Sequence, residues 1–298
     1  MRDEYVGVET KMKTCPDCLP CILKQVNNVA KEAAATSVQL REMLTRASRM
    51  LPTLDLALSP AHNSTIALRL IPELCGVADP YETKKQESNQ QALKLLPAMK
   101  RLVAESGDKI RTAALVAAAG NVIDLAIQDN RHNELEGVLE AVINEGFAVD
   151  HSDRFKKALT GAKSIVYLGD NAGEVVFDRE FARLLGENGR KVVFAVHGGP
   201  ILNDALMQDA REAGLTEVVE VVSTGSDWIG LELETCSAEF RKLFAEADLV
   251  VAKGHGNFET VAELASAPAE TYFILRAKCA SVAALLGVKV GQVVFRRK

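Results

Sequence analysis

The sequence predicts an α/β protein in which an all-helical N-terminal half precedes a mostly parallel sheet covered by helices on both faces. Up to about residue 145, apolar residues recur at spacings of three and four, which is typical of helices. From about Gly161 onward, short runs rich in Val and Ile alternate with helical stretches, and this alternation indicates βαβ units. The 298 residues are 48% hydrophobic and 25% charged, a globular composition with room for two domains.

Five helices are expected in the N-terminal half. They are Cys18–Ala35, Ser37–Leu51, Ala61–Cys75, Asp79–Glu105 and Lys109–Ala126. Pro80 stands where the first turn of a helix tolerates proline. Gly107 and Asp108 have the character of a helix stop and an N-cap between the last two helices. Short alternating β-branched runs do not occur before about residue 145, so no strand is expected there.

Strands and helices are expected to alternate after that point. The strands are Ser164–Leu168, Lys191–Val196, Glu217–Val222, Leu249–Ala252, Glu270–Leu275 and Val293–Phe295. The helices are Glu174–Leu185, Asn203–Ala213, Cys236–Ala245, Asn257–Ala265 and Lys278–Leu286. We therefore divide the chain into a helical domain, residues 1–150, and an α/β domain, residues 151–298, and we expect residues 1–13 to be mobile.

Composition excludes several classes of protein. The net charge of −5 argues against a basic nucleic-acid-binding protein, and an aromatic content of 5% leaves little for base stacking. No run of about 18 apolar residues occurs, so we expect no membrane partner. Residues 1–13 lack the apolar segment of a secretory signal, and a cytoplasmic protein is expected. The sequence does not predict an oligomeric state.

Polar, glycine-rich segments follow four of the expected strands. They are Gly169–Glu174, His197–Asp204, Ser223–Asp227 and Lys253–Asn257. Any single residue among them would fit a helix cap or a turn, and His197 and His255 are supported only by their position. In an open parallel sheet, however, ligands bind outside the carboxyl ends of the strands. The four segments together predict one shared polar pocket.

The residue types in this pocket indicate phosphoryl transfer to water. Asp170, Asn171 and Asp204 offer the hard oxygen ligands that Mg²⁺ or Mn²⁺ prefers. Helix N-termini favour an anion, and Lys253 adds a full positive charge. Either Asp204 or Glu174 could accept the proton of an attacking water, and Asp170 could instead form a covalent aspartyl phosphate.

Other common nucleotide and hydrolase signatures are missing. The first strand is followed by GxxxG rather than GxGxxG, and neither GxxxxGK[ST] nor GxSxG occurs. The same strand ends in Gly-Asp-Asn and not in the Asp-x-Asp pair of common aspartyl-phosphate phosphatases. The pocket therefore belongs to none of these classes.

Several ordered motifs together resemble one known family. They are Gly169–Glu174, Asn203-Asp204, Lys253-Gly254 with Gly256-Asn257, Asp79-Pro80-Tyr81, Ala119–Asp124 and Cys18–Gln25. They resemble the motifs of the DUF89 family, also called the damage-control phosphatase or ARMT1-like family. The resemblance runs from about Cys15 to about Val294, and the cysteine pair is similar to that of its prokaryotic, stand-alone branch.

The resemblance implies a metal-dependent phosphatase acting on a small phosphorylated metabolite, such as a phosphosugar or a phosphopantetheine-like compound, damaged forms included. It implies Mg²⁺, Mn²⁺, Co²⁺ or Ni²⁺ held by Asp170, Asn171 and Asp204. It implies a Rossmann-like α/β/α fold behind a helical part. For the substrate it implies contacts from Asn203, Lys253, Gly254 and Asn257. A non-catalytic binding protein for an anionic metabolite or nucleotide is the alternative, and a protein carboxyl methyltransferase is a lesser one.

Asn121 is a further candidate from the helical half. It follows a run of small residues, Thr112–Ala119, that would let a helix approach another element closely. Asn121 could then reach the pocket and orient the substrate or a metal-bound water. Alternatively, Gly120 breaks the helix and has only a structural role.

The cysteines Cys15, Cys18 and Cys21 form a CxxCxxC pattern, whose spacing suits Zn²⁺ or an iron–sulfur cluster. Gln25 stands where a ferredoxin-type run has its fourth cysteine. Cys279 or Cys75 could supply the fourth ligand of such a second metal site. Redox pairing and burial against a helix remain open as alternatives.

Overall fold

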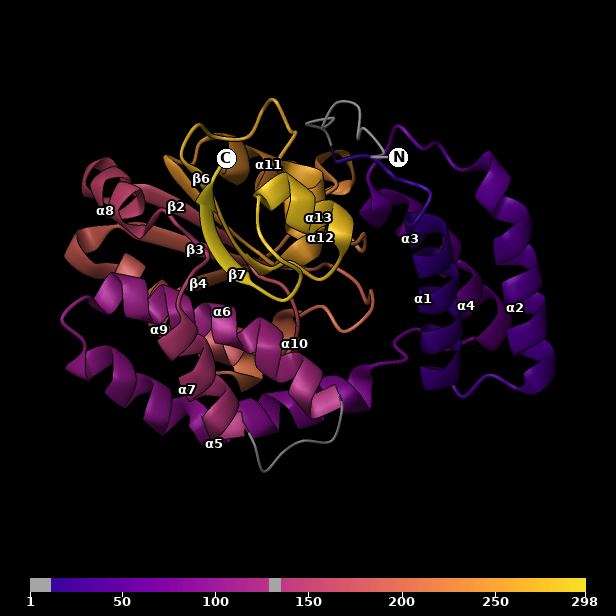
Figure 1. Ribbon diagram of the computed structural model, residues 1–298, viewed down its shortest axis with the longest axis horizontal. Coiled ribbons are helices and arrows are strands. Elements are labelled where there is room, and N and C mark those ends of the chain that lie inside the picture. Colours follow the sequence, from indigo (N-terminus) through magenta and orange to yellow (C-terminus); the bar gives the residue numbers. More distant parts are fainter. Residues whose placement is uncertain (1–11, 129–134) are drawn as a thin grey trace, which may run out of the picture.

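A central sheet organises the computed structural model, which describes residues 12–128 and 135–298 (Figure 1). Within these residues the sheet has seven strands in the order β1-β7-β6-β5-β2-β3-β4. They are β1 (Val149–Asp150), β2 (Ser164–Leu168), β3 (Lys191–Val196), β4 (Glu220–Ser223), β5 (Leu249–Lys253), β6 (Thr271–Arg276) and β7 (Val293–Arg297). Only the β6–β7 pair is antiparallel. The predicted α/β class with a mostly parallel sheet is confirmed.

Helices cover both faces of the sheet because side chains along each buried strand alternate between two hydrophobic clusters. In β2, Ile165 and Tyr167 join one cluster, whereas Val166 and Leu168 join the other. The first cluster packs against α5 (Glu82–Glu105), α6 (Lys109–Gln128), α7 (Leu135–Glu145), α8 (Ser152–Gly161), α9 (Glu174–Leu185) and α10 (Met207–Glu212). The second packs against α11 (Ala238–Ala245), α12 (Gly254–Val261) and α13 (Ala280–Leu286).

The first four helices form a separate cluster beside the sheet, at the right of Figure 1. They are α1 (Cys18–Glu32), α2 (Ser37–Met50), α3 (Pro60–Leu68) and α4 (Leu70–Cys75). Thr36 begins α2 with a capping box to Gln39, and the single helix expected over 61–75 is divided at Arg69. Ile201 and Ile229, from the loops after β3 and β4, belong to the same apolar cluster and connect it to the sheet.

Helices α5 and α6 precede residue 150 but share the core of the sheet rather than that of α1–α4. The domain division at residue 150 stays a prediction. In the structure, α5 and α6 lie before that residue and pack into the core of the α/β part. Helix α6 continues through Gly120, where a Cβ would lie 3.3 Å from Glu174 Cβ and from Phe177 Cβ on α9. Gly120 therefore permits a close helix–helix approach, and the alternative of a helix break is wrong.

Two further expectations concern the chain's ends and membranes. Of residues 1–13, for which mobility was expected, residues 1–11 lie outside the described part of the chain. Across 12–128 and 135–298, none of the helices combines the length and apolar character that a bilayer crossing needs.

Candidate active site

The loops after β2 and β3 are joined through their backbones at the carboxyl edge of the sheet. Asn171 and Asp204 form an isolated antiparallel bridge, and the N–H of Ala205 donates to the carbonyl of Asp170 at 2.9 Å. Strand β2 lies between β3 and β5. From β2 the chain continues to β3 on one side, whereas β5 pairs with β2 on the other side. Such a switch point is where parallel sheets form clefts. Asp170, Asn171 and Asp204 are thus brought together, as the sequence predicts.

The carboxylate of Asp170 lies against the first residue of α12. A Cβ at Gly254 would overlap this carboxylate, and the backbone there has φ +81°, so only glycine fits. The helix begins with free N–H groups near the acid. Burial raises the pKa of Asp170 well above its usual value, and the negative charges of Glu174 and Asp204 raise it further. A positive charge at this point would stabilise the ionised form.

Glu174 lies beneath Asp170 and is held by three donors. The Nδ2 of Asn171 donates to its Oε1 at 2.8 Å, the Nδ2 of Asn121 donates to its Oε2, and the Nζ of Lys253 lies 3.3 Å from the same Oε2. The side chain is only 1% exposed. Asn121 therefore does reach the site from α6, also lying 3.3 Å from Asp170 Oδ2, and its own Oδ1 is buried without a protein partner among the described residues.

Lys253 is fully buried below the site. Its Nζ lies 2.8 Å from Asp178 Oδ1, which also accepts a hydrogen bond from the hydroxyl of Tyr167 at 2.8 Å. Burial works to lower the pKa of Lys253, but the charges of Asp178 and Glu174 outweigh it and hold the pKa above its usual value. Burial raises the pKa of Asp178 to about 6, against the opposing effect of Lys253. The predicted phosphate clamp thus lies away from the cavity and contacts carboxylates.

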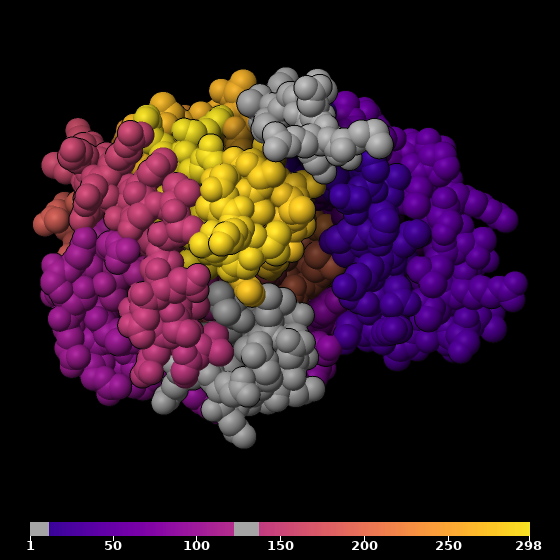
Figure 2. All heavy atoms as spheres, viewed as in Figure 1, coloured from indigo at the N-terminus to yellow at the C-terminus, as the bar shows by residue number. Residues whose placement is uncertain are grey.

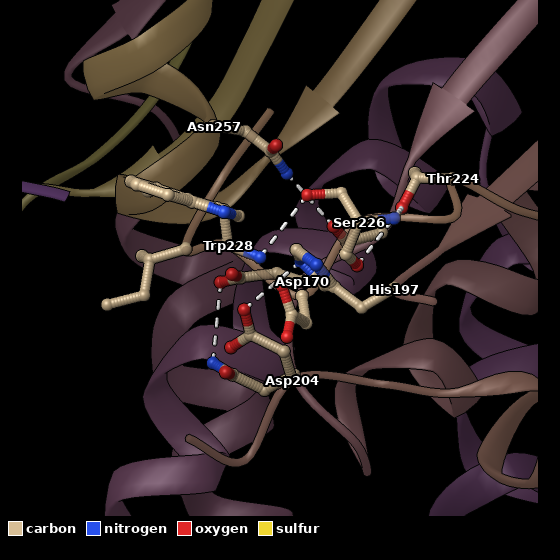
Figure 3. A network of polar contacts seen from close by, with 12 residues as sticks. Asp170, His197, Asp204, Thr224, Ser226, Trp228 and Asn257 are labelled. Carbon is tan, nitrogen blue, oxygen red and sulfur yellow. Dashed lines mark hydrogen bonds and ion pairs between the residues drawn. The ribbon is translucent and has the colours of Figure 1, made fainter. Parts of the chain in front are cut away.

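A second set of polar contacts fixes the remaining strand ends (Figure 3). The Nε2 of His197 lies 3.1 Å from Asp204 Oδ2, while its Nδ1 is buried without a partner in the described structure. The Nδ2 of Asn257 donates to the carbonyls of Gly169 at 2.9 Å and Lys253 at 2.8 Å. Asn257 therefore ties the ends of β2 and β5 together, and His197 orients Asp204.

A cavity of about 410 Å³ opens above these residues, between α1 and α3 on one side and the strand ends on the other. Its polar floor consists of Asp170, Asn171, Asn203 and Asp204. Apolar side chains, among them Leu202 and Ile229, form part of its wall. Figure 2 shows the C-terminal segment, in yellow, meeting the indigo N-terminal helices, a contact that includes Cys15 Sγ and Ser281 Oγ at 3.3 Å.

Lys278 also lines the cavity, although it lies outside the four polar segments that predict the pocket. It lies two residues beyond β6, and its positive charge acts to lower the pKa of Asp170. Its place in the sequence could have indicated this position, because Lys278 follows the fifth expected strand just as Lys253 follows the fourth.

The cysteine candidates line the other side of the cavity. Cys18, Cys21 and Cys279 face it, and Cys15 Sγ lies 3.4 Å from Cys18 Sγ. Among the described residues, no group of three or more His, Cys, Asp and Glu side chains is arranged to hold a metal ion. The floor of the cavity has two carboxylates and two amides. The second metal site at the cysteines stays a prediction. The side chain of Asp124 lies outside the described residues.

Comparisons with known proteins identify the family of this chain. The family model described as the damage-control phosphatase ARMT1-like domain matches residues 14–294. A damage-control phosphatase of Archaeoglobus fulgidus is 33% identical over 96% of this chain and 99% of its own length. One from Pyrococcus horikoshii is 31% identical over 96% and 98%.

A solved structure is similar over the same extent. The crystal structure of a DUF89 family protein from Pyrococcus horikoshii superimposes with a TM-score of 0.85, at 30% sequence identity, covering 96% of this chain and 99% of that one. The architecture of sheet, covering helices and N-terminal helical cluster is therefore shared with that protein. The chain belongs to the damage-control phosphatase ARMT1-like family, which is the DUF89 family that its motifs resemble.

Proposed function

We propose that this protein is a divalent-metal-dependent phosphatase that hydrolyses a small phosphorylated metabolite, such as a phosphosugar or a phosphopantetheine-like compound. The observation that carries the proposal is the meeting of Asp170, Asn171 and Asp204 on the floor of a cavity that Lys278 also lines. The names of the archaeal relatives support a phosphatase. The cavity volume of about 410 Å³ suits a metabolite rather than a macromolecule.

The donor set fits Mg²⁺ or Mn²⁺. Asp170, Asn171 and Asp204 present oxygen atoms only, which is the set these hard cations prefer. A cation would also relieve the electrostatic cost of the buried Asp170 carboxylate beside Glu174 and Asp204. When bound, such a metal acts as a Lewis acid on a phosphate oxygen and makes water a better nucleophile.

The chain's own groups then have distinct roles. Lys278 binds the phosphate dianion through charge. Asp204 accepts the proton of the attacking water, because it lines the cavity and is oriented by His197 at 3.1 Å. Glu174 is a poorer base, since three donors already occupy its oxygens away from the cavity lining. Lys253 and Asn121 position Glu174 and Asp170 and do not touch the substrate.

Phosphate release from a panel of phosphosugars and phosphopantetheine tests this function. We expect turnover with Mn²⁺ or Mg²⁺, none with EDTA, and at least a ~10³-fold lower kcat/KM in Asp170→Asn. Asp153→Asn is the matched control, because that side chain is 88% exposed on α8, and it should keep full activity. Turnover that survives both EDTA and the Asp170 change would refute the metal site. Binding of the metabolites without phosphate release would instead indicate a binding protein.

The water mechanism is separable from a covalent one. With direct attack of water no phosphorylated enzyme forms, so quenching during turnover should recover no acyl phosphate on Asp170. If Asp170 carried the phosphoryl group, transfer from the substrate would form an aspartyl phosphate that can be trapped before water releases the phosphate. Recovery of Asp170 as a hydroxamate after hydroxylamine treatment would contradict the direct attack of water.

A further inference from the structure

Two thiols lie together where the N-terminal segment enters α1. Cys18 is the first residue of α1, Cys15 precedes it by three positions, and their Sγ atoms are 3.4 Å apart. Both cysteines are free and partly exposed. The backbone turns tightly between them, because the N–H of Cys18 donates to the carbonyl of Cys15 at 2.9 Å. This turn holds the two sulfur atoms next to each other, and such proximity is what formation of a disulfide requires.

The two thiols differ in environment. Hydrogen bonds from Ser281 and from Cys18 hold the pKa of Cys15 below its usual value, although burial, the largest single effect, works in the other direction. Burial raises the pKa of Cys18 to about 12. The beginning of a helix also favours a negative charge close to it. Cys15 Sγ has the Ser281 hydroxyl at 3.3 Å as a further hydrogen-bond partner, so we assign Cys15 as the attacking thiol. Cys18, whose Sγ lies 3.4 Å away, is placed to resolve what Cys15 forms.

The pair also contacts the wall of the active-site cavity. Cys15 Sγ lies 3.3 Å from Ser281 Oγ, in the first turn of α13 and three residues after Lys278. Both Ser281 and Lys278 line the cavity, as does Cys18. A change at Cys15 therefore acts on the segment that carries the positively charged lining residue.

We propose that Cys15 and Cys18 form a reversible thiol–disulfide couple, oxidised by a low-molecular-weight disulfide, and that oxidation releases Ser281 in the cavity wall. The Cys15 thiolate attacks the small disulfide, forming a mixed disulfide and expelling one small thiolate. The Cys18 thiolate then attacks Cys15 Sγ and expels the second. Two protein thiols are oxidised, one disulfide is reduced to two thiols, and two protons pass to water or to the expelled thiolates.

The neighbouring cysteines supply matched controls. Cys21 and Cys279 line the same cavity and are exposed, but burial raises the pKa of each. Of the remaining thiols, Cys75 is the last residue of α4 and Cys236 is buried. Cys21 and Cys279 are more exposed to the oxidant than Cys15 and Cys18, so what distinguishes the pair is the contact between its two sulfurs.

Oxidation by glutathione disulfide, followed by acid quenching, alkylation and mass spectrometry, tests the couple. Trypsin gives the peptide Thr14–Lys24, which contains Cys15, Cys18 and Cys21. The Cys21→Ser variant removes this ambiguity. In wild type, Cys21→Ser and Cys279→Ser we expect loss of two thiols and a Cys15–Cys18 bridge. In Cys18→Ser we expect the reaction to stop at a glutathione adduct on Cys15.

Three results would overturn the couple. They are a bridge between Cys21 and Cys279, a wild-type protein that keeps all its thiols, and a Cys18→Ser variant that forms the same bridge-mass product as wild type. Stoichiometric zinc or iron in protein purified without added metal, lost in Cys15→Ser, would replace it by a metal site. This readout does not depend on catalysis, so it stands or fails separately from the proposed phosphatase.

The effect on the cavity rests on the proposed function and is measured as turnover. We expect oxidation to raise KM about fivefold, as the loss of one hydrogen bond would, with kcat within about twofold, and dithiothreitol to reverse it. Ser281→Ala should show the same higher KM in the reduced state and no further response. An oxidised wild type with the KM of the reduced enzyme would contradict the coupling, while phosphate release by neither form would contradict the phosphatase itself.

Discussion

At the scale of single residues, the site depends on a buried ion network beneath the cavity floor. Lys253 has no exposed surface and contacts two carboxylates, Glu174 and Asp178, that are also almost fully buried. A buried charge of this kind is tolerated only while its partners remain. The network thereby fixes the position of Glu174, which in turn receives hydrogen bonds from Asn121 and Asn171.

Replacing Lys253 by Met should remove that compensation. We expect the free energy of unfolding to fall by about 3–5 kcal/mol, because two buried carboxylates lose their cation. Urea denaturation measures this change. Lys242→Met is the matched control, since Lys242 is 75% exposed and its Nζ lies as far as 4.0 Å from Oε1 of its partner Glu246. This substitution should change the free energy of unfolding by less than about 0.5 kcal/mol. Equal midpoints for the two variants would contradict the network's role.

The pH dependence of stability should carry the signature of Asp248. Backbone N–H groups of Lys163 and Ser164, each 2.9 Å from Asp248 Oδ2, hold its pKa below the usual 3.8. An acid whose pKa is lowered by folding stabilises the native state above its unfolded pKa and loses that contribution as the pH falls through the folded pKa. Asp248→Asn should therefore cost about 1 kcal/mol at pH 7, and progressively less below about pH 4. Denaturant titration of both proteins between pH 7 and pH 3 measures this. A difference in stability between wild type and variant that does not change with pH would contradict the role of Asp248.

The sequence predicts the cavity floor better than the layers around it. Asp170, Asn171 and Asp204 follow from the rule that parallel strands end at one edge. Lys253 was expected to face the substrate, but whether a side chain at a strand end points into or away from a pocket depends on packing that no local pattern encodes. The pairing of His197 with Asp204 could not be predicted for the same reason, because it depends on how the loop between them folds back on itself.

At the scale of elements, the close contact of α6 and α9 determines how far the side chain of Asn121 reaches into the site. Gly120 allows the helices to approach until the backbone of Glu174 is in contact. Asn121, the next residue, then reaches both Glu174 and Asp170. A run of small, fully buried residues before it, Ala113–Ala119 with Leu115 and Val116, is consistent with this close packing.

Gly120→Val should separate these two helices. We expect a loss of about 1–3 kcal/mol in stability, because a Cβ already lies 3.3 Å from three atoms of α9 before the extra methyl groups are added. We also expect phosphate release to fall, as Asn121 and Glu174 move apart. Gly137→Ala on α7 is the control: no atom lies within 4 Å of the new Cβ, so stability should rise by about 0.5–1 kcal/mol. Thermal unfolding of both variants decides the question.

Element prediction succeeded where the pattern was strong and local. The bounds of β2, β3 and α9 coincide with those expected from sequence. Strand β1 was not expected, since Val149 and Asp150 are too few to show a period and exist as a strand only by pairing with β7. Helices α7 and α8 were also not expected.

At the scale of the whole molecule, the cavity exists because two separately cored parts meet. Arg69, between α3 and α4, makes two contacts with Asp227 in the loop after β4, at 2.5 and 2.6 Å. Its guanidinium also lies 5.8 Å from the centre of the Trp228 ring. The helical cluster α1–α4 is thus fastened to the loops of the sheet beside the cavity.

Removing this connection should loosen substrate binding more than chemistry. We expect Arg69→Met to raise KM about three- to tenfold with kcat nearly unchanged, because the pair is worth about 1 kcal/mol and lies outside the cavity lining. Arg46→Met is the matched control, since Arg46 contacts Glu42 and Glu73 within the helical cluster itself. Steady-state kinetics separate the two parameters. Equal kinetics for the two variants would show that the connection does not shape the cavity.

The separate apolar core of α1–α4 has a consequence for how such a protein diversifies. The residues proposed to perform the reaction come from the strand ends, whereas α1 and α3 supply the opposite wall. Mutations in the first 75 residues can therefore alter which compound is admitted while the hydrolytic groups stay in register. New specificities can arise by drift in that part of the gene, with the inherited chemistry left intact in the rest.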